Sequence, residues 1–232
     1  MAERVKSKRR YDSPRRREQA AATRREILEA AQRLFEERGY ATTTVAAIAA
    51  EAGVALKTVY AAFETKGGVL RALWNVLLRG DDRDAPVGER AWYREVLDEP
   101  DPERQLLLVA RNARVVKLRI GVLLEVIRSA APSDPDIQKL WERIQADFHA
   151  NQRAIVETLA NKQALADDLD ADGAADILWA VNLSNLWQLL VRDRGWTPEQ
   201  YEKWVGEVLC TRLLRARPTA QASAGTTRRG EP

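Results

Sequence analysis

The chain of 232 residues is poor in the side chains that build most reactive and metal-binding sites. It has one cysteine, Cys210, and one histidine, His149. A single cysteine excludes an intramolecular disulfide and a thiolate metal cluster, and a single histidine excludes a histidine-based metal site. No glycine-rich phosphate loop is present, and no motif pairs Cys210 with His149 as nucleophile and base. We therefore interpret the chain as a protein without enzymatic activity or cofactor, in preference to a small helical enzyme.

One acidic stretch follows the pattern of a calcium-binding loop only in part. Asp168, Asp170, Asp172 and Gly173 match the start of an EF-hand loop, but the twelfth position holds Trp179 where a bidentate glutamate is needed. Acidic residues are also favoured at a helix N-terminus, because they interact well with the helix dipole. We therefore predict a helix start here and no metal site.

Long apolar runs and strand patterns are also lacking. No apolar run approaches the length of about 18 residues that suggests a membrane span. The basic segment MAERVKSKRRYDSPRRRE lacks the apolar core of a secretory signal, so we expect a cytoplasmic protein with no membrane partner. Helical periodicity dominates the rest of the chain, which predicts an all-α fold.

The charge is distributed unevenly along the chain. The formal net charge is +3, but residues 1–66 carry +5 and the remaining residues carry −2. A basic front end on a nearly neutral body indicates a polyanionic partner for the front end. The alternative, a solvated arm without a partner, stays open for the first 18 residues.

The helical pattern is divided by Pro, Gly and Asp clusters. A capping box formed by Thr23 and Glu26 predicts the start of the first helix, and Gly39 predicts its end. The further helices are expected at about 45–52, 55–62, 67–79, 91–99, 104–130 (one helix, or two with a kink near Gly121), 136–163, 174–194 and 198–216. We expect a basic arm at 1–20 and a polar tail at 217–232, both without fixed structure.

The stretch GYATTTVAAIAAEAGVALKTVYAAF contains two short helices separated by Gly53. A glycine inside a helix costs roughly 1 kcal/mol relative to alanine, but at a turn it adopts a left-handed conformation without penalty. Ile48 and Val59 supply a core face for the two helices. The pattern predicts a helix-turn-helix at about 44–63, whose second helix enters the major groove of double-stranded DNA.

Polar residues on this unit suit contacts with DNA. Lys57 and Thr58 can bond base edges or phosphates, and threonine hydroxyls at a helix N-terminus suit a phosphate. The alternative is a plain helical hairpin with a surface lysine and tyrosine. The predicted DNA-binding residues are Thr42, Thr43, Thr44, Ala55, Leu56, Lys57, Thr58, Tyr60 and Lys66.

Residues 21–80 resemble the TetR family of bacterial transcriptional regulators. The matching features are Phe35, Gly39–Tyr40, Thr42–Thr44, Ile48–Ala49, Ala52–Gly53–Val54, Thr58, Tyr60, Phe63 and Lys66. The resemblance implies that the threonines, the tyrosine and Lys66 contact the DNA backbone. Ala55 and Ala61 depart from the family, which often has Ser and His there, so base selection relies more on Lys57, Thr58 and the basic arm. The resemblance also implies a larger helical domain, at about 81–216, that binds a ligand and dimerises.

The last two predicted helices are rich in Leu, Val and Trp, so we expect them to pair with their copies in a homodimer. The candidate interface residues are Trp187, Leu190, Trp204, Leu209 and Leu213. The alternative is that these faces are buried within the monomer.

The ligand is less well specified by the sequence. Asn182 and Asn185 lie three residues apart on an apolar helix and need partners when buried, although a neighbouring helix can also supply those partners. Seven tryptophans suit an apolar or aromatic ligand, as they would suit an ordinary core. The candidate ligand-binding residues are Trp92, Arg111, Trp141, His149, Trp179, Asn182 and Asn185.

These observations lead to one functional hypothesis and one alternative. The first is a dimeric repressor that binds a palindromic operator and is released by a small apolar or aromatic effector. The alternative is a dimeric DNA-binding factor without a small-molecule ligand.

Overall fold

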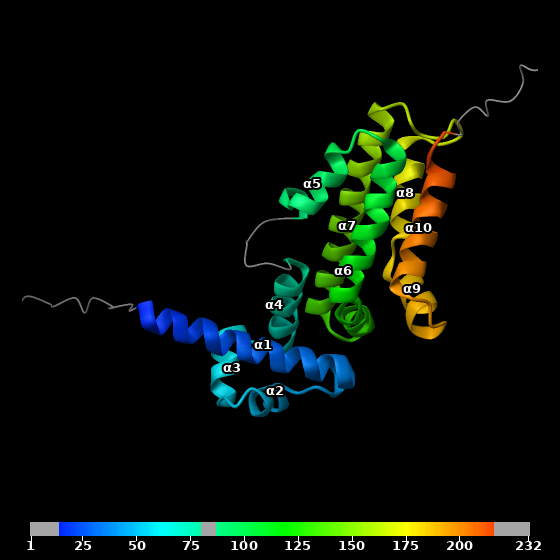
Figure 1. Cartoon of the computed structure of the whole chain (residues 1–232). Helices are drawn as coiled ribbons and strands as arrows, with labels where there is room; N and C mark the ends of the chain where they lie inside the picture. Colours follow the sequence, from blue (N-terminus) through cyan, green and yellow to red (C-terminus); the bar gives the residue numbers. More distant parts are fainter. Residues whose placement is uncertain (1–13, 80–86, 216–232) are drawn as a thin grey trace, which may run out of the picture.

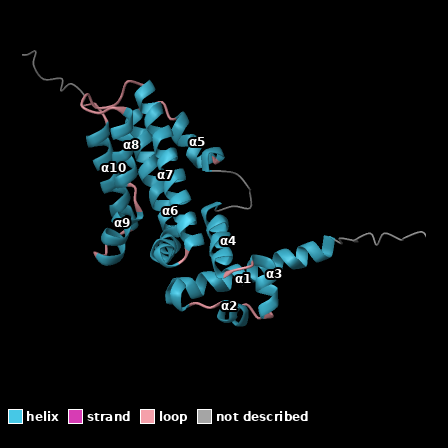
Figure 2. Cartoon of the chain, turned by 180° about the vertical axis from the view of Figure 1, so that it is seen from behind, coloured by secondary structure: helices cyan, strands magenta, loops and turns pink. Residues whose placement is uncertain are grey.

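The computed structural model describes residues 14–79 and 87–215, and the named elements in these ranges are helices. Figure 1 and Figure 2 show the chain from the front and from behind, with its helices joined by loops. The all-α fold, with an N-terminal helix-turn-helix domain and a larger helical C-terminal domain, is confirmed. The predicted tail at 217–232 and most of the predicted arm lie outside the described residues.

The N-terminal part consists of α1 (Pro14–Thr42), α2 (Val45–Glu51), α3 (Leu56–Phe63) and α4 (Lys66–Arg79). The larger part consists of η1 (Val87–Glu89), α5 (Ala91–Asp98), α6 (Pro102–Ala130), η2 (Ala131–Ser133), α7 (Pro135–Asn161), α8 (Ala171–Val181), α9 (Ser184–Trp187), η3 (Gln188–Asp193) and α10 (Pro198–Leu213). In Figure 1, α1 to α3 lie at one end of the molecule, and α4 leads from them toward the bundle of α5 to α10.

The first helix begins earlier than the capping box predicted. α1 starts at Pro14, so Thr23 lies inside the helix and does not cap it. Proline is well suited to the first turn of a helix, because its missing N–H would have no intrahelical partner there. Residues 14–20, which we expected to belong to an unstructured arm, are therefore helical. Gly39 interrupts the helical geometry with φ 75° and ψ 174°, close to the predicted end.

Two predictions about the later helices have different outcomes. α6 is one continuous helix through Gly121, where an added Cβ would lie 3.5 Å from Nε1 of Trp187. That distance is an ordinary van der Waals contact, so Gly121 neither kinks α6 nor is required for its packing against Trp187. The single helix expected at 174–194 is wrong, because α8 ends at Val181, and the chain restarts as α9 and the π-helix η3 after Asn182 and Leu183.

The acidic stretch that resembled a calcium loop starts a helix, as predicted. Asp170 is the N-cap of α8, and its side chain accepts a hydrogen bond from the amide of Gly173 at 2.7 Å. The carboxylate of Asp168 pairs with Arg212 at 3.0 Å, and Asp172 pairs with Arg153. These contacts are capping and surface ion pairs of ordinary helices.

The buried apolar side chains form two cores along the bundle. The first core joins α1 to α4 with the C-terminal half of α6 and the N-terminal half of α7; its members include Ile27, Phe35, Ile48, Leu70, Leu123, Ile127 and Ile137. The second core joins α5, the other halves of α6 and α7, and α8 to α10; its members include Leu106, Val156, Leu178, Tyr201 and Leu209. The N-terminal part is therefore packed on α6 and α7 through α1 and α4, and α2 and α3 pack in turn on those two helices.

Candidate DNA-binding surface and ligand cavity

The turn between α2 and α3 is built by local sequence features. Thr44 caps α2, because its hydroxyl accepts a hydrogen bond from the amide of Ala47 at 3.1 Å. Gly53 has φ 66°, a conformation that disfavours residues with a Cβ. The chain bends by 112° between the two helices, which is within the usual range for a helix-turn-helix. Val59 and Phe63 are buried, so the opposite face of α3 is directed outward.

The predicted residues of α3 lie mainly on this outward face. Lys57 is exposed, Leu56 is 43% exposed and Tyr60 is 48% exposed, while Thr58 is half-buried. Ala55 is the exposed N-cap of α3 and makes no side-chain capping bond. A short helix therefore presents a lysine, a tyrosine hydroxyl and its own N-terminus to solvent. These groups suit contacts with the phosphates and base edges of DNA.

The three threonines have different surroundings. Thr44 and Thr42 are exposed, and the hydroxyl of Thr42 donates to the carbonyl of Arg38. Thr43 is only 1% exposed, and its hydroxyl lies 2.8 Å from the carbonyl oxygen of Gly39. Thr43 therefore holds the end of α1 and is not placed to contact DNA, contrary to our expectation.

Lys66 makes internal contacts instead of standing open toward a phosphate. Its ammonium donates to the carbonyl of Tyr40 at 2.8 Å and lies 4.1 Å from the centroid of the Tyr40 ring. The hydroxyl of Tyr40 donates to Oδ2 of Asp134 at 2.6 Å. Burial lowers the pKa of Lys66, and the bond from Tyr40 lowers the pKa of Asp134. Together these contacts tie the start of α4 to the N-cap of α7.

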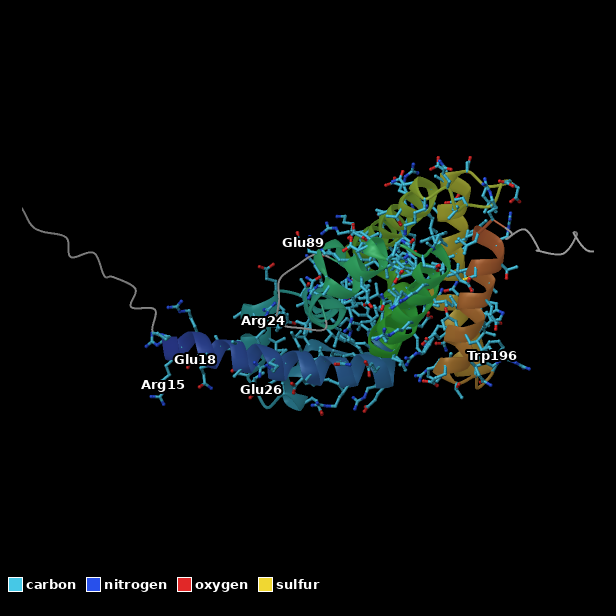
Figure 3. The ribbon with its side chains drawn as sticks, turned by 45° about the horizontal axis from the view of Figure 1, so that its top comes forward. Arg15, Glu18, Arg24, Glu26, Glu89 and Trp196 are labelled. Carbon is cyan, nitrogen blue, oxygen red and sulfur yellow. The ribbon has the colours of Figure 1, made fainter. Side chains whose placement is uncertain are left out.

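Basic side chains continue onto the first turns of α1. Arg15, Arg16 and Arg17 are exposed there, and Figure 3 shows Arg15 at the opposite end of the molecule from Trp196. Further along, Arg24 donates to the carbonyl of Ala62 at 2.9 Å, which fixes α1 against the end of α3. The basic turns of α1 and the outward face of α3 therefore belong to the same N-terminal domain, whose helices share the first core.

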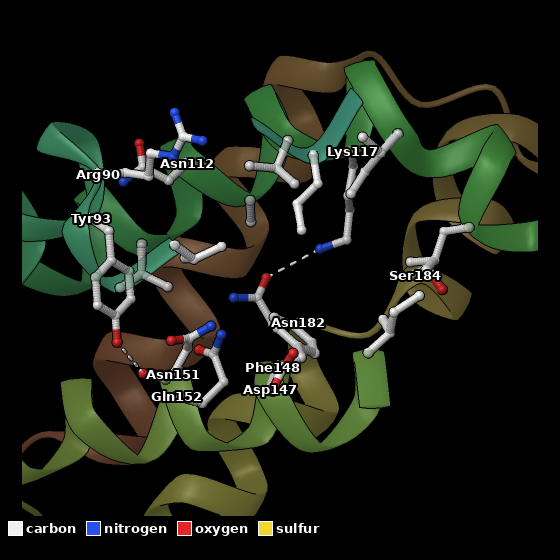
Figure 4. A pocket seen from close by; sticks show the side chains of 18 of the residues that line it. Arg90, Tyr93, Asn112, Lys117, Asp147, Phe148, Asn151, Gln152, Asn182 and Ser184 are labelled. Carbon is white, nitrogen blue, oxygen red and sulfur yellow. Dashed lines mark hydrogen bonds between the residues drawn. The ribbon is translucent and has the colours of Figure 1, made fainter. Parts of the chain in front are cut away.

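A cavity of about 700 Å³ lies in the larger part of the molecule (Figure 4). It is enclosed by α4, α5, α6, α7 and the link between α8 and α9. Its walls are mainly apolar and aromatic and include Trp74, Leu78, Trp92, Tyr93, Val116, Ile120, Phe148 and Ile155. Ligand sites typically have this size and character, with a few polar groups that orient the ligand.

The cavity includes only part of the predicted ligand-binding set. Trp92 and Asn182 line it. Arg111 and Asn185 are exposed and do not line it, and Trp141 packs on the first core. These three side chains lie on other faces of their helices, away from the cavity.

His149 and Trp179 were also expected at the ligand site, and neither lines the cavity. The Nε2 of His149 lies 2.9 Å from a carboxylate oxygen of Asp176, and the ring centroids of His149 and Trp179 are 6.0 Å apart. His149 therefore faces α8, on a different side of α7 from the cavity.

The most important polar residues of the cavity were not predicted. Lys117 is 7% exposed, and its ammonium donates to Oδ1 of Asn182 at 3.1 Å. Burial lowers the pKa of Lys117 to about 7. Gln152 on α7 is also buried, and its Oε1 has no hydrogen-bond partner among the described residues. The sequence carried a signal for Lys117, because it shares the helical phase of the buried Ala113 and Ile120.

Most of the predicted dimer residues are inside the molecule. Leu209 and Leu213 are fully buried, and Trp187 packs edge-on against Tyr201 with the ring centroids 5.0 Å apart. These three belong to the second core, as the alternative interpretation required. Leu190 and Trp204 are half-buried at its border.

Among the described residues, no single helix is long and apolar enough to cross a membrane, and by length and composition alone only the bent pair of α2 and α3 could do so together.

Comparison with known proteins identifies the family. Residues 27–73 match the family model of bacterial regulatory proteins of the tetR family. The chain is 33% identical over 196 residues to the HTH-type transcriptional regulator TtgR of Pseudomonas putida, covering 81% of this chain and 90% of TtgR. The chain belongs to the TetR family. It is a DNA-binding transcriptional regulator and not an enzyme, as the sequence predicted.

Other TetR regulators agree with this assignment. The chain is 32% identical over 196 residues to the probable HTH-type transcriptional regulator ArpR, also of Pseudomonas putida, covering 81% of this chain and 90% of ArpR. The fold matches that of SmeT in a complex with triclosan, with a TM-score of 0.66 and 19% identity over 91% of this chain and 99% of SmeT. It also matches NalD of Pseudomonas aeruginosa, with a TM-score of 0.65 and 22% identity over 85% of this chain and 98% of NalD.

Proposed function

We propose that this TetR regulator is a homodimeric repressor that leaves a palindromic operator when a small, largely apolar or aromatic ligand fills the cavity. The observation that carries this proposal is the position of α4. Val69 and Leu70 of α4 are fully buried in the first core beneath the helix-turn-helix. Trp74 and Leu78, further along the same helix, line the cavity.

The connection between the cavity and α3, the helix proposed to contact DNA bases, is short. Only Glu64 and Thr65 separate α3 from α4, and Lys66 holds the start of α4 to Tyr40. Packed helices tend to move as rigid bodies, because the closely packed side chains between them leave no space that could absorb a displacement locally. A ligand that pushes on Trp74 or Leu78 would therefore move α4 and turn α3 with it.

A dimer explains how such a movement would release DNA. Two copies of α3 fit successive major grooves only when they are spaced by about one helical turn, roughly 34 Å. A small rotation of each reading helix would change that spacing and weaken the contacts with both half-sites. Leu189, which is 54% exposed, and the half-buried Leu190 and Trp204 lie on the last helical segments, and we propose that they contribute to the contact between subunits.

The similar proteins support this proposal by analogy. NalD is described as the secondary repressor of the MexAB-OprM multidrug efflux pump. SmeT was solved as a complex with triclosan. Repression and the binding of a small apolar molecule are therefore each found on this fold, in different proteins. The alternative, a dimeric DNA-binding factor without an effector, would leave the cavity without a use.

The first experiment is selection of bound sequences from a random duplex DNA library with the purified full-length chain. We expect an enriched palindrome, because a symmetric dimer reads two inverted half-sites. No enriched motif would contradict the proposed operator and would favour non-specific DNA binding.

The second experiment tests the cavity with a matched pair of variants. Val116 lines the cavity, whereas its neighbour Val115 is exposed on the same helix and does not. Val116→Trp should fill part of the cavity and reduce binding of the fluorescent apolar probe N-phenyl-1-naphthylamine. Val115→Trp should bind the probe as the wild type does. Equal probe binding by both variants would show that the cavity is not the ligand site.

A further inference from the structure

We propose that Lys117 and Asn182 form an anion-binding end of the cavity, so that the regulator selects ligands that carry a carboxylate or another acidic group on an apolar body. This inference rests on the proposed ligand site and specifies its chemistry. A purely apolar ligand would leave the charged end of the cavity unused.

The first argument is the burial of an ammonium group without a counter-ion. Lys117 lies on the core face of α6, and Figure 4 shows its ammonium directed toward the amide of Asn182. Its interactions are the hydrogen bond to Oδ1 of Asn182 at 3.1 Å and the ring of Tyr201, whose centroid is 5.3 Å away. No ion pair joins Lys117 to a carboxylate of the described residues.

This arrangement is unfavourable in the empty protein. An ammonium carries three donors, and Asn182 accepts only one of them. A buried charge is costly unless it is paired with an opposite charge. Lysines are rarely buried for this reason, and burial disfavours the ammonium form of Lys117 in the empty protein. An anion that enters the cavity would supply the missing opposite charge and stabilise the ammonium form.

Asn182 adds a second donor at the same place. Its Oδ1 faces the ammonium of Lys117, so its Nδ2 is directed away from that bond. Because Asn182 lines the cavity and is buried, its N–H groups can also reach an oxygen of the ligand. An ammonium and an amide N–H together suit the two oxygens of a carboxylate.

Other charged groups around Lys117 do not take the place of this anion. On α7, Asp147 lines the cavity but is exposed to solvent. On α6, Arg114 pairs with Glu202 and Glu199 of α10. Glu199 and Glu202 are therefore already paired with an arginine, and Glu207 of the same helix lies 3.9 Å from the ammonium of Lys203.

Gln152 indicates what the other part of the ligand contains. Its Oε1 is buried, lacks a partner among the described residues and belongs to a side chain that lines the cavity. A carbonyl oxygen accepts hydrogen bonds, so a hydroxyl or N–H group of the ligand would satisfy it. The preferred ligand therefore has an acidic group, an apolar or aromatic body, and a hydrogen-bond donor.

The test uses two fluorescent probes with the same ring skeleton. 8-Anilinonaphthalene-1-sulfonate is anionic, and N-phenyl-1-naphthylamine is its neutral counterpart. Lys117→Met should weaken binding of the anionic probe by about 10- to 100-fold, as expected for loss of a charged hydrogen bond. It should change binding of the neutral probe by less than about 3-fold, since the apolar walls remain. Lys139→Met, on the exposed face of α7, is the control for net charge and should change neither.

A second variant keeps the test independent of the lysine. Asn182→Asp places a carboxylate beside Lys117, and this internal counter-ion should compete with the anionic probe while sparing the neutral one. Equal losses for both probes in both variants would overturn the anion site and leave the ligand cavity intact. If the wild type binds neither probe, or if Val116→Trp binds both unchanged, the proposed ligand site itself fails.

Discussion

Replacement of Lys117 by methionine should stabilise the ligand-free protein, and the stabilisation should decrease as the pH rises. Methionine is similar in length to the stem of lysine and carries no charge. Burial lowers the pKa of Lys117 from 10.5 to about 7. In the unfolded chain this pKa is close to the ordinary value, so the unfolded state holds the proton more strongly than the folded state does.

The size of the effect follows from these two pKa values. Below about pH 7 the lysine is charged in both states, and its burial reduces the free energy of unfolding by about 5 kcal/mol. Between about pH 7 and 10.5 only the unfolded state is protonated, so the wild type gains about 1.4 kcal/mol per pH unit. The advantage of methionine should therefore fall by about 3 kcal/mol between pH 6 and pH 9. Loss of the bond to Asn182 subtracts about 1 kcal/mol from the gain.

Urea denaturation of the ligand-free wild type and Lys117→Met at pH 6 and pH 9, at equal protein concentration, measures this difference. The comparison isolates Lys117, because all other titratable side chains are present in both proteins. Lys139→Met again serves as the control. A difference in unfolding free energy between wild type and Lys117→Met that is the same at both pH values would refute the reasoning.

The remaining predictions concern the DNA-binding end. Tyr60→Phe should weaken binding by a similar factor on all DNA sequences, whereas Lys57→Ala should change the preferred sequence; equal losses on every site would show that Lys57 contacts only phosphate. Deletion of residues 1–18 should lower the affinity and flatten the dependence of log affinity on log salt, measured by fluorescence anisotropy, and an unchanged slope would exclude phosphate contacts by this segment. Tyr40→Phe should lower the free energy of unfolding at pH 7 by roughly 1.5–3 kcal/mol, because the tyrosine donates to a charged carboxylate. The bond lowers the pKa of Asp134, so this stabilisation is present above the ordinary carboxyl pKa and disappears as the pH falls through the lowered value. If Tyr40→Phe is still less stable than the wild type by the same amount at pH 2, the assignment of the bond is contradicted.

The helix-turn-helix could be predicted because its signals are local. The glycine at position 53, the capping threonine at 44 and the apolar spacing of α2 and α3 all lie within about 20 residues. Thr43 is the exception in this stretch. Its neighbours are exposed threonines, and only the packing of α1 places it inside. Residue type alone does not distinguish a hydroxyl that holds a helix end from one that faces DNA.

The cavity could be predicted only in small part, because its lining comes from five segments that are distant in the chain. Whether His149 faces the cavity or α8 depends on a rotation of α7 that the helical period does not specify. The apolar pattern likewise identified Leu209 and Leu213 as core-forming without showing whether the core lies within one chain or between two. Lys117 was within reach of sequence reasoning, since a charged residue in an apolar helical phase is unusual.

The first core has a consequence for the exchange of parts between regulators. Leu123 and Ile127 of α6, together with Ile137 of α7, are buried in that core with the side chains of α1 to α4. A chimera that joined residues 14–79 to the larger domain of a different regulator would place those side chains against unmatched surfaces. Residues 14–79 of this protein therefore cannot be transferred alone to another regulator and keep their packing. A functional graft has to carry the facing turns of α6 and α7 as well.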